Sequence, residues 1–326
     1  MKIIFNLLNV GIGNNGGSHS LVKSANILSE LGNDVVIVSD GKSQYTWGKI
    51  VVPYLKIKDI NEVFGDVIIA TGIRSLKSTN KSKIKKKYHY IRGHEIWNFP
   101  EKELIEKIQE SPTIKIVNSI CLKNKLKSFN IESTIIRPGY DFNEIFPLNI
   151  RGENKKIILG GIFNQGKKRQ TKRTEWIFLA YKILKEKYPI ELMMYGSDGE
   201  PVLFLDKYLK DPTIEEKNKL YNMIDIWLSP SELEGLHIPP AEALLTECSV
   251  VTTNAKMSGT EDYIINDQTG LVSENNFNSF LSCIEILINH KMIRKELGKS
   301  GREKILSLGS RKDNMLKMIE FFGRNE

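Results

Sequence analysis

The sequence lacks the residues that would place it among disulfide-stabilised, metal-clustered or membrane-spanning proteins. Its 326 residues include three cysteines, Cys121, Cys248 and Cys283, which lie far apart and match no metal-binding or disulfide pattern. No stretch approaches the roughly 18 consecutive apolar residues of a membrane-spanning helix. The first residues alternate apolar side chains with asparagine and are charged only at Lys2, which favours a first strand over a signal peptide. We therefore expect a reducing, cytoplasmic location.

The chain is long enough for two hydrophobic cores, and its positive charge is concentrated in one half. Because 326 residues exceed what one core usually serves, two domains are expected. The net charge is +8, and residues 1–150 hold 21 lysines and arginines against 14 acidic residues, whereas the remainder holds 26 against 25. Part of the excess lies in KSTNKSKIKKK, residues 77–87. This run is either a solvated loop or a surface for an anionic membrane or an anionic acceptor, nucleic acid included.

Strand and helix patterns alternate along the chain. KIIFNLLNV predicts a first strand, and the helical spacing after it has Ser18 as its N-cap and Gly32 as its stop. Proline, glycine and charged residues interrupt the alternation at 145–155, which we interpret as a linker. The alternation then restarts and ends in two helices. The sequence predicts an α/β protein with two Rossmann-like, doubly wound parallel-sheet domains, 1–150 and 151–326, and leaves open that the last helix packs back on the first domain.

A glycine-rich loop follows the first predicted strand. GIGNNG, from Gly11 to Gly16, has the spacing G-x-G-x-x-G, and Asp40 ends the second predicted strand. This pattern is typical of dinucleotide-binding proteins, so a nicotinamide- or flavin-dependent oxidoreductase is one interpretation. The glycines also suit a permissive turn, or a loop that lets a substrate approach the backbone closely.

A basic loop follows the first strand of the second half. Five of its residues are cationic: Lys167, Lys168, Arg169, Lys172 and Arg173. A helix begins directly after them, and cations at a helix N-terminus favour an anion-binding site. A diphosphate is the expected ligand, and an exposed basic loop without a ligand is the structural alternative.

Two glutamates bracket a later turn in the segment SELEGLHIPPAEA. Glu242 suits a helix start, where an acidic residue complements the helix dipole. Glu234 lies on the turn before a glycine, where its carboxylate can accept hydrogen bonds from hydroxyl groups. The backbone amides of Leu236, His237 and Ile238 can point at a developing negative charge. Two carboxylates beside an anion-binding helix start suit a sugar linked to a ribose diphosphate.

The stretch E-G-L-H-I-P-P-A-E resembles the E-x7-E motif of the retaining GT-B glycosyltransferases of family 4, the glycosyl transferases group 1 type. Other segments resemble the same family and fall in the same order: NNGGSHSLVKSANILSELGNDVVIVS, IVNSICLKNKLKSFNIESTIIRPGYD, LGGIFNQ with KRTEWIFLAYKIL, and KMSGTEDYIINDQTGLV. The resemblance covers most of the chain. It implies a GT-B fold, in which two Rossmann-like domains face a central cleft.

The resemblance also implies roles for individual residues. Glu234 would bind hydroxyls of the transferred sugar, and Glu242 the ribose of the nucleotide. Lys172, together with Arg173 or Lys168, would bind the diphosphate. The residues expected to line the rest of the nucleotide-sugar site are Gly16, Gly17, Glu95, Gly235, Leu236, His237 and Ile238. His94 would face the transferred sugar from the first domain, with a structural histidine at a strand end as the alternative.

The implied reaction keeps the anomeric configuration, and the leaving diphosphate helps to deprotonate the acceptor. No enzyme nucleophile is then required, and the sequence has no convincing Ser-His-Asp or Cys-His arrangement. It also has no D-x-D triad of the metal-dependent type, so we expect no metal. We expect no cofactor either, because the nucleotide-sugar is a co-substrate.

The chain departs from the family at three points. Leu236-His237 stands where the family often has Phe-Gly, which would shape the sugar pocket differently. Ile162 follows Gly161 where the family often has an arginine, so the cations of the basic loop would have to compensate. The first domain is also short, which points to reduced or unusual acceptor recognition.

The sequence therefore predicts a hexosyl-type glycosyltransferase that uses a nucleotide-sugar, most simply a UDP-sugar. The acceptor would be a glycan or lipid-linked saccharide, a protein, or a modified base in DNA, and the enzyme would be cytoplasmic with an option for peripheral membrane binding. The alternatives are an NAD(P)-dependent oxidoreductase using the Gly11–Gly16 loop, and a non-catalytic sugar- or nucleic-acid-binding protein of the same fold. The nucleotide base, the sugar, the acceptor, the diphosphate-binding cation (Lys167, Lys168, Lys172 or Arg173) and the oligomeric state stay open.

Overall fold

The computed structural model describes residues 1–148, 150–151, 156–164, 170–197, 199–200 and 202–324. The chain divides into two compact units: unit 1 is Met1–Gly139 with Gly309–Glu326, and unit 2 is Tyr140–Leu308. The division differs from the predicted boundary at residue 150, because Tyr140 and Ile145 are buried in the core of unit 2. Residues 149 and 152–155 of the predicted linker 145–155 lie outside the described residues.

Unit 1 is built on a seven-stranded parallel sheet in the order β3-β2-β1-β4-β5-β6-β7. Its strands are β1 (Lys2–Asn6), β2 (Asp34–Ser39), β3 (Tyr54–Lys56), β4 (Val67–Ala70), β5 (Lys86–Ile91), β6 (Ile114–Val117) and β7 (Thr134–Ile135). Its helices are α1 (Gly16–Glu30), the short η1 (Ile60–Glu62), α2 (Ile73–Lys81), α3 (Glu101–Glu110), α4 (Ile120–Lys127) and α10 (Arg311–Arg324). The strand order reverses between β1 and β4, which is the switch point of this sheet.

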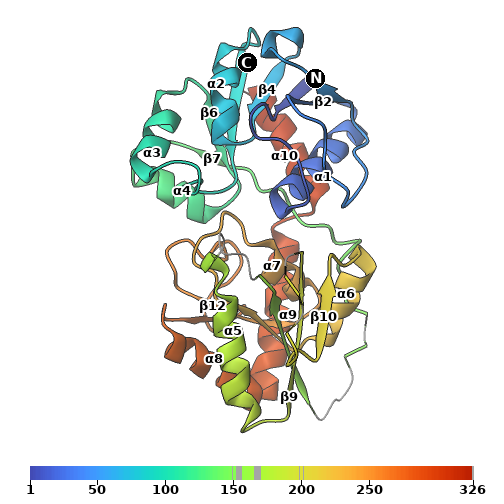
Figure 1. Cartoon of the computed structure of the whole chain (residues 1–326), viewed down its shortest axis with the longest axis vertical. Coiled ribbons are helices and arrows are strands. Elements are labelled where there is room, and N and C mark those ends of the chain that lie inside the picture. The colour runs from blue at the N-terminus through green and yellow to red at the C-terminus, as the bar shows by residue number, and fades with distance from the viewer. Residues whose placement is uncertain (149, 152–155, 165–169, 198, 201, 325–326) are drawn as a thin grey trace. The chain divides into compact units, whose positions relative to one another are not determined.

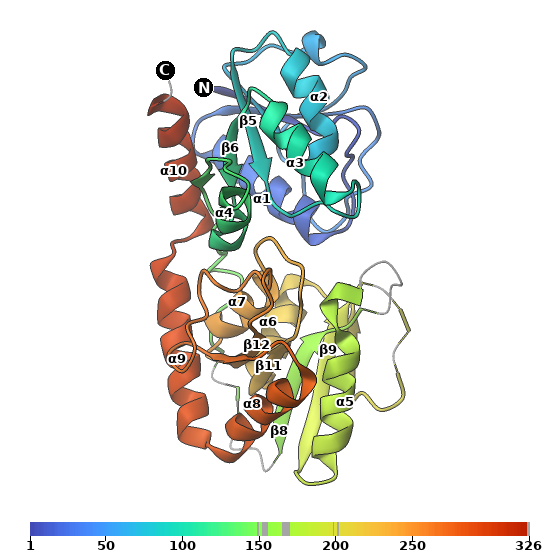
Figure 2. The same cartoon turned by 90° about the vertical axis from the view of Figure 1, so that its left-hand side faces the viewer.

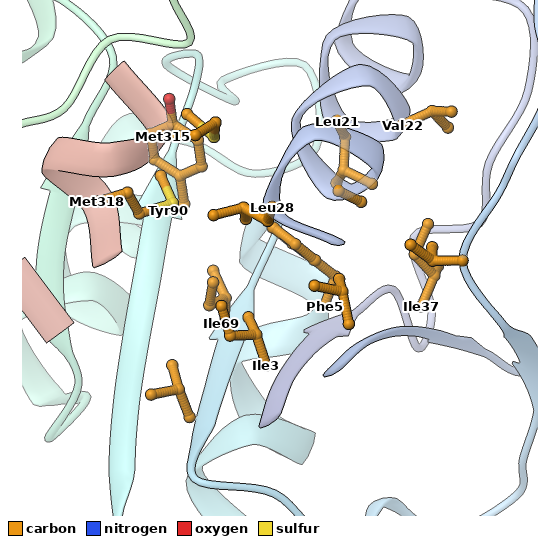
Figure 3. Packing of buried hydrophobic residues seen from close by; sticks show 14 of the residues in the cluster. Ile3, Phe5, Leu21, Val22, Leu28, Ile37, Ile69, Tyr90, Met315 and Met318 are labelled. Carbon is orange, nitrogen blue, oxygen red and sulfur yellow. The ribbon is translucent and has the colours of Figure 1, made fainter. Parts of the chain in front are cut away.

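The core of unit 1 joins the beginning and the end of the chain. Along β1, Ile3 and Phe5 belong to the cluster that also contains residues of α1 and α10, whereas Ile4 belongs to a separate cluster. This alternation is the two-residue period of a strand covered on both faces. Figure 3 shows Met315 and Met318 of α10 in the first cluster, and Figure 1 shows α10 beside α1. The last helix, α10, is therefore part of unit 1 and shares its hydrophobic core.

Unit 2 contains a six-stranded parallel sheet in the order β10-β9-β8-β11-β12-β13. Its strands are β8 (Ile157–Ile162), β9 (Ile190–Gly196), β10 (Lys207–Lys210), β11 (Ile226–Ser229), β12 (Ser249–Thr253) and β13 (Leu271–Ser273). Its helices are the short η2 (Gln170–Lys172), α5 (Thr174–Lys185), α6 (Ile214–Met223), α7 (Ile238–Leu245), α8 (Phe277–Asn289) and α9 (Lys291–Ser307). Both sheets confirm the predicted doubly wound α/β class.

Helices cover both faces of the second sheet. Residues of α5 and α8 form one hydrophobic cluster with the strands; Figure 2 shows α5 beside β9, and α8 contacts β12 and β13. Residues of α6 and α7 form the second cluster. Gly161 of β8 is required by this packing, because a Cβ there would lie 2.6 Å from the Ile177 side chain of α5. No helix in the part of the chain that the structure describes is long and apolar enough to cross a membrane.

Three local predictions were wrong. The N-cap of α1 is Asn15, whose side chain accepts a hydrogen bond from the Ser18 amide at 2.9 Å, so the predicted N-cap Ser18 lies inside the helix. The chain ends in three helices instead of two, because His290 separates α8 from α9. The lysine-rich run 77–87 is no continuous loop, since it begins in α2 and ends in β5.

Candidate functional site

The strand order of unit 2 creates a place for a ligand at one edge of its sheet. The first strand, β8, has β9 on one side and β11 on the other, so the chain leaves β8 and β11 in opposite directions along the sheet. Ligands of open α/β sheets bind at the carboxyl ends of the strands beside such a switch point. The loops after β8 and β11 carry Lys172 and Glu234, which the sequence predicts as diphosphate and sugar ligands.

Glu234 is fixed by its backbone and paired through its side chain. Its amide donates to the Met257 carbonyl at 2.8 Å, and its carboxylate forms an ion pair with Lys172. Gly259 lies against it with φ of +71°, and a Cβ there would approach the Glu234 Cβ to 2.6 Å. A side chain at position 259 would therefore both strain the backbone and displace the carboxylate.

The electrostatics around Glu234 keep it ionised. Burial alone would raise the pKa of this carboxyl, but His237 and Lys172 outweigh burial, and the pKa is lowered. Burial lowers the pKa of His237 to about 4, so this ring is neutral at pH 7. Lys172 is therefore the cation that stabilises the Glu234 carboxylate at neutral pH. Its side chain is 20% exposed and that of Glu234 14%, so a ligand can reach both.

Glu242 is held by two side chains of helix α6. Its carboxylate accepts from the Lys217 ammonium at 2.9 Å and from the Tyr221 hydroxyl at 2.9 Å. The hydroxyls of Tyr221 and Tyr195 are 2.6 Å apart. Burial raises the pKa of Tyr221, so its hydroxyl stays protonated and can donate. Glu242 itself is 16% exposed, which leaves its outer edge accessible to a ligand hydroxyl.

Sequence reasoning missed the residues that support Glu242. Lys217 and Tyr221 are four residues apart on α6 and therefore project from the same face of the helix. That spacing is visible in the sequence. However, nothing in the sequence shows that this face meets α7, which carries Glu242.

The remaining cations of the basic loop differ in what they contact. Arg173 adopts a left-handed backbone conformation with φ of 50°, pairs with Glu232 and Asn275, and stacks over the Trp176 ring at 4.5 Å. Its guanidinium is therefore occupied by protein partners. The predicted alternatives at 167 and 168, and Arg169, lie outside the described residues. Lys172 is the one predicted phosphate ligand that the structure places beside a predicted sugar ligand, within the described residues.

The turn between the two glutamates presents fewer amides than expected. The His237 amide donates to the Gly259 carbonyl at 2.9 Å, so it is not available to a ligand. Helix α7 begins at Ile238 and continues with two prolines, which have no N–H to donate. Gly235 and Leu236 complete the turn. The Leu236 and Ile238 amides remain candidates for a developing negative charge, and no hydrogen-bond acceptor for them is found among the described residues.

The predicted residues of unit 1 lie at the switch point of its own sheet. Gly16 and Gly17 begin α1, and the Gly17 carbonyl accepts a hydrogen bond from Arg92, whose guanidinium also donates to the Thr71 carbonyl at 3.0 Å. A Cβ on Gly16 would meet no protein atom within 4 Å. Gly16 is therefore not required by packing, which keeps open the prediction that a ligand approaches it.

The two charged residues predicted in unit 1 have structural partners. Glu95 accepts from the Ile73 amide at 3.1 Å at the start of α2, and burial raises its pKa. His94 is buried, its Nε2 lies 2.7 Å from the Glu101 carboxylate, and burial lowers its pKa. These contacts match the structural interpretation of His94 more closely than a ring presented to a sugar.

Comparisons with known proteins agree with the geometry of unit 2. Residues 162–304 match the family model described as glycosyl transferases group 1. A curated relative, the capsular polysaccharide biosynthesis glycosyltransferase CapM of Staphylococcus aureus, is 27% identical over 169 residues, which are 47% of this chain and 42% of CapM. The matched region thus spans less than half of that relative.

Solved structures resemble the chain over nearly its whole length. Sucrose-phosphate synthase from Thermosynechococcus elongatus covers 99% of this chain, with 98% of its own chain matched, a TM-score of 0.76 and 13% identity. Anabaena Alr3699/HepE in complex with UDP and glucose covers 99%, with 100% of its own chain matched, a TM-score of 0.77 and 12% identity. At these identities the likeness concerns the fold. The structural likeness shows a GT-B fold, and the match to the glycosyl transferases group 1 covers residues 162–304, within unit 2.

Proposed function

We propose that the chain transfers a hexose-like sugar from a UDP-sugar to a hydroxyl acceptor and keeps the anomeric configuration. The observation that carries this proposal is the placement of Glu234 and Glu242 at one edge of the unit 2 sheet, each partly exposed and each paired with a lysine. Carboxylates accept hydrogen bonds from sugar hydroxyls, and a lysine beside them can bind a phosphate. The complex of HepE with UDP and glucose supports the choice of nucleotide.

In the proposed site, each ligand group has a protein group of matching chemistry. Glu242, oriented by Lys217 and Tyr221, accepts from the ribose hydroxyls. Lys172 binds the diphosphate, and Glu234 accepts from hydroxyls of the sugar. The bond between the anomeric carbon and the diphosphate oxygen breaks, the acceptor oxygen bonds to that carbon on the same face, and the acceptor proton passes to the leaving diphosphate. Lys172 stabilises the charge that develops on this leaving group.

We propose a saccharide as the acceptor, because CapM is named for capsular polysaccharide biosynthesis. A protein or a modified DNA base would be the outcome of a negative saccharide screen. The proposed reaction uses no metal and no cofactor. In the part of the chain that the structure describes, no group of three or more metal-ligating side chains is found. Transfer measured with and without EDTA tests this part directly, and loss of activity that added Mg²⁺ or Mn²⁺ restores would refute it.

The family match weighs against the oxidoreductase alternative, because the matched family is one of glycosyl transferases. The match lies within unit 2, whereas the Gly11–Gly16 loop lies in unit 1. The acidic residue of the dinucleotide-binding pattern, Asp40, accepts from the Asn9 amide at 3.2 Å and thus has a structural partner. A catalytically silent sugar-binding protein of the same fold would bind the nucleotide-sugar without turning it over.

A thermal-shift panel tests the proposed function. UDP, GDP, ADP, their common sugars and NAD(H) are added to the wild type, to Glu242→Ala, and to Glu215→Ala as a control on an exposed glutamate of α6. A ligand at 100 times its Kd adds about 2.7 kcal/mol of stability. We expect UDP and a UDP-sugar to stabilise the wild type and Glu215→Ala, and Glu242→Ala much less. Stabilisation by NAD(H) alone, indifferent to Glu242, would overturn the proposal.

A further inference from the structure

His237 has a buried ring nitrogen that the proposed reaction does not use. The residue is 3% exposed, and its Nδ1 lies 3.0 Å from the Ser229 hydroxyl. Its Nε2 is buried without a hydrogen-bond partner among the described residues and lies 3.6 Å from the nearer carboxylate oxygen of Glu234. A buried nitrogen without a partner is unfavourable, so its position calls for an explanation.

The backbone of His237 fixes where the ring lies. Its amide donates to the Gly259 carbonyl at 2.9 Å, and its carbonyl accepts from the Tyr263 hydroxyl. The charged groups that face the ring are Glu234, from the same turn, and Lys172, from the loop after β8. The ring is thus held from two sides and directed at the sugar-binding carboxylate.

The neutral ring can carry its proton on the nitrogen that faces Glu234. The Ser229 hydroxyl can donate to Nδ1, which leaves Nε2 as the protonated nitrogen, and the neighbouring carboxylate favours the same tautomer. The separation of 3.6 Å exceeds an ordinary hydrogen bond of about 2.7–3.2 Å by less than 1 Å. A small shift of the carboxylate therefore completes the bond.

A diphosphate carries more negative charge than the Glu234 carboxylate and competes with it for the Lys172 ammonium. When the ammonium turns to the phosphates, the Glu234 carboxylate loses its main cationic partner while remaining largely buried. An unpaired buried carboxylate is strongly unfavourable, so a second hydrogen-bond donor must replace the first.

We propose that His237 is this replacement: a positioning residue that takes over Glu234 when the diphosphate draws Lys172 away. The inference rests on the proposed function. The exchange keeps Glu234 ionised and oriented toward the sugar hydroxyls while Lys172 serves the leaving group. Lys172 thus pairs with Glu234 in the empty site and leaves that carboxylate when the nucleotide-sugar binds.

The first test needs no ligand. The imidazole of His237 is titrated by NMR in the wild type and in Lys172→Met, with His237→Gln used to assign its signal among the five histidines. Because Lys172 lowers the pKa of His237 and Glu234 raises it, we expect the pKa in Lys172→Met to rise by at least about one unit from its value near 4. An unchanged pKa, or a ring protonated on Nδ1 at neutral pH, would overturn the proposal.

Saturating UDP provides the second arm, since its diphosphate should move Lys172 as the mutation does. If Lys172→Met raises the pKa of His237 and UDP does not, the exchange at Glu234 stands and the proposed diphosphate site fails. If neither raises the pKa, the exchange itself fails.

A pair of variants distinguishes positioning from packing. The Gln side chain in His237→Gln can still donate to Glu234, whereas His237→Phe fills the space without a donor. The Kd of UDP is the readout, because its diphosphate draws Lys172 away from Glu234. We expect His237→Phe to raise this Kd by about tenfold and His237→Gln to keep it within about threefold of the wild-type value. Equal losses for the two variants would show a packing role and contradict the proposal.

Discussion

The two sheets carry charged residues at their switch points, but they use them differently. In unit 1, the Arg92 guanidinium donates to backbone carbonyls, and the Glu95 carboxylate accepts from a backbone amide. In unit 2, Lys172 pairs with Glu234 and Lys217 with Glu242, side chain to side chain. Backbone partners cannot leave without unfolding a loop, whereas paired side chains can exchange one another for a ligand. Unit 2 therefore holds its candidate ligand-binding side chains in exchangeable pairs. Unit 1 holds its charged side chains against the backbone, in a fixed frame.

The largest effect is expected when a carboxylate of unit 2 is neutralised. Glu234→Gln should lower kcat by about 10²–10³-fold, because an oriented group that acts on the transition state is lost. The fold should persist, since the backbone bond of residue 234 to Met257 does not involve the side chain. Transfer assays together with circular dichroism check this. A variant with more than a tenth of the wild-type kcat would remove Glu234 from the mechanism.

A change in the frame of unit 1 should affect stability instead. Arg92→Leu removes the hydrogen bonds of a half-buried guanidinium to the Gly17 and Thr71 carbonyls, and we expect a loss of about 1–2 kcal/mol. Urea unfolding measures the loss, and the affinity for UDP should change less than about threefold under folding conditions. A stable variant with lost UDP affinity would reverse the assignment of roles to the two units.

Acid should destabilise unit 1 through a buried histidine. Burial lowers the pKa of His89 to about 3 from 6.5, and neither ring nitrogen has a hydrogen-bond partner among the described residues. Below pH 6.5 the unfolded chain binds a proton that the folded chain binds only near pH 3, so the free energy of unfolding falls as the pH falls through that window. The contribution at pH 5 is about 2 kcal/mol. Thermal unfolding of His89→Leu should therefore lose less stability between pH 7.5 and pH 5 than the wild type does, and an identical loss in both would contradict the account.

The smallest effect is expected at Arg173. Its guanidinium pairs with Glu232 and Asn275 and stacks over Trp176, so it is committed to protein partners. Arg173→Gln should weaken UDP binding by less than about threefold, whereas Lys172→Met should weaken it by about tenfold or more. Isothermal titration compares the two directly. Equal losses would assign the diphosphate to both cations.

Local pattern was sufficient to predict much of the fold and the position of the glutamates. Buried strands such as β1 and β8 are apolar runs that end in glycine-containing loops, and such runs can be recognised without tertiary information. The turn between Glu234 and Glu242 follows a strand, so its place at the carboxyl edge of a parallel sheet could be inferred. Short edge strands such as β3 and β10 carry too few residues to show a pattern.

Long-range contacts could not be predicted, because they depend on which surfaces meet. Lys172 and Glu234 are 62 positions apart, and Lys217 and Glu242 are 25 apart. No local pattern in the sequence shows these pairs. None shows that Arg173 binds Glu232 and Asn275 instead of an anion. The same reason explains the boundary at 139. The sequence does not show in which of the two cores Tyr140 packs, and tertiary packing places it in unit 2.

The most direct test of the account is the affinity for UDP and for UDP-glucose of the wild type, Glu234→Gln and Glu242→Gln, measured by titration calorimetry. If Glu242 binds the ribose, Glu242→Gln weakens both ligands by about tenfold or more. If Glu234 binds the sugar, Glu234→Gln weakens UDP-glucose alone and leaves UDP bound as tightly or more tightly, because Lys172 is released. Unchanged UDP affinity in Glu242→Gln, or equal weakening of both ligands in Glu234→Gln, would contradict the central claim that the two carboxylates divide the nucleotide-sugar between them.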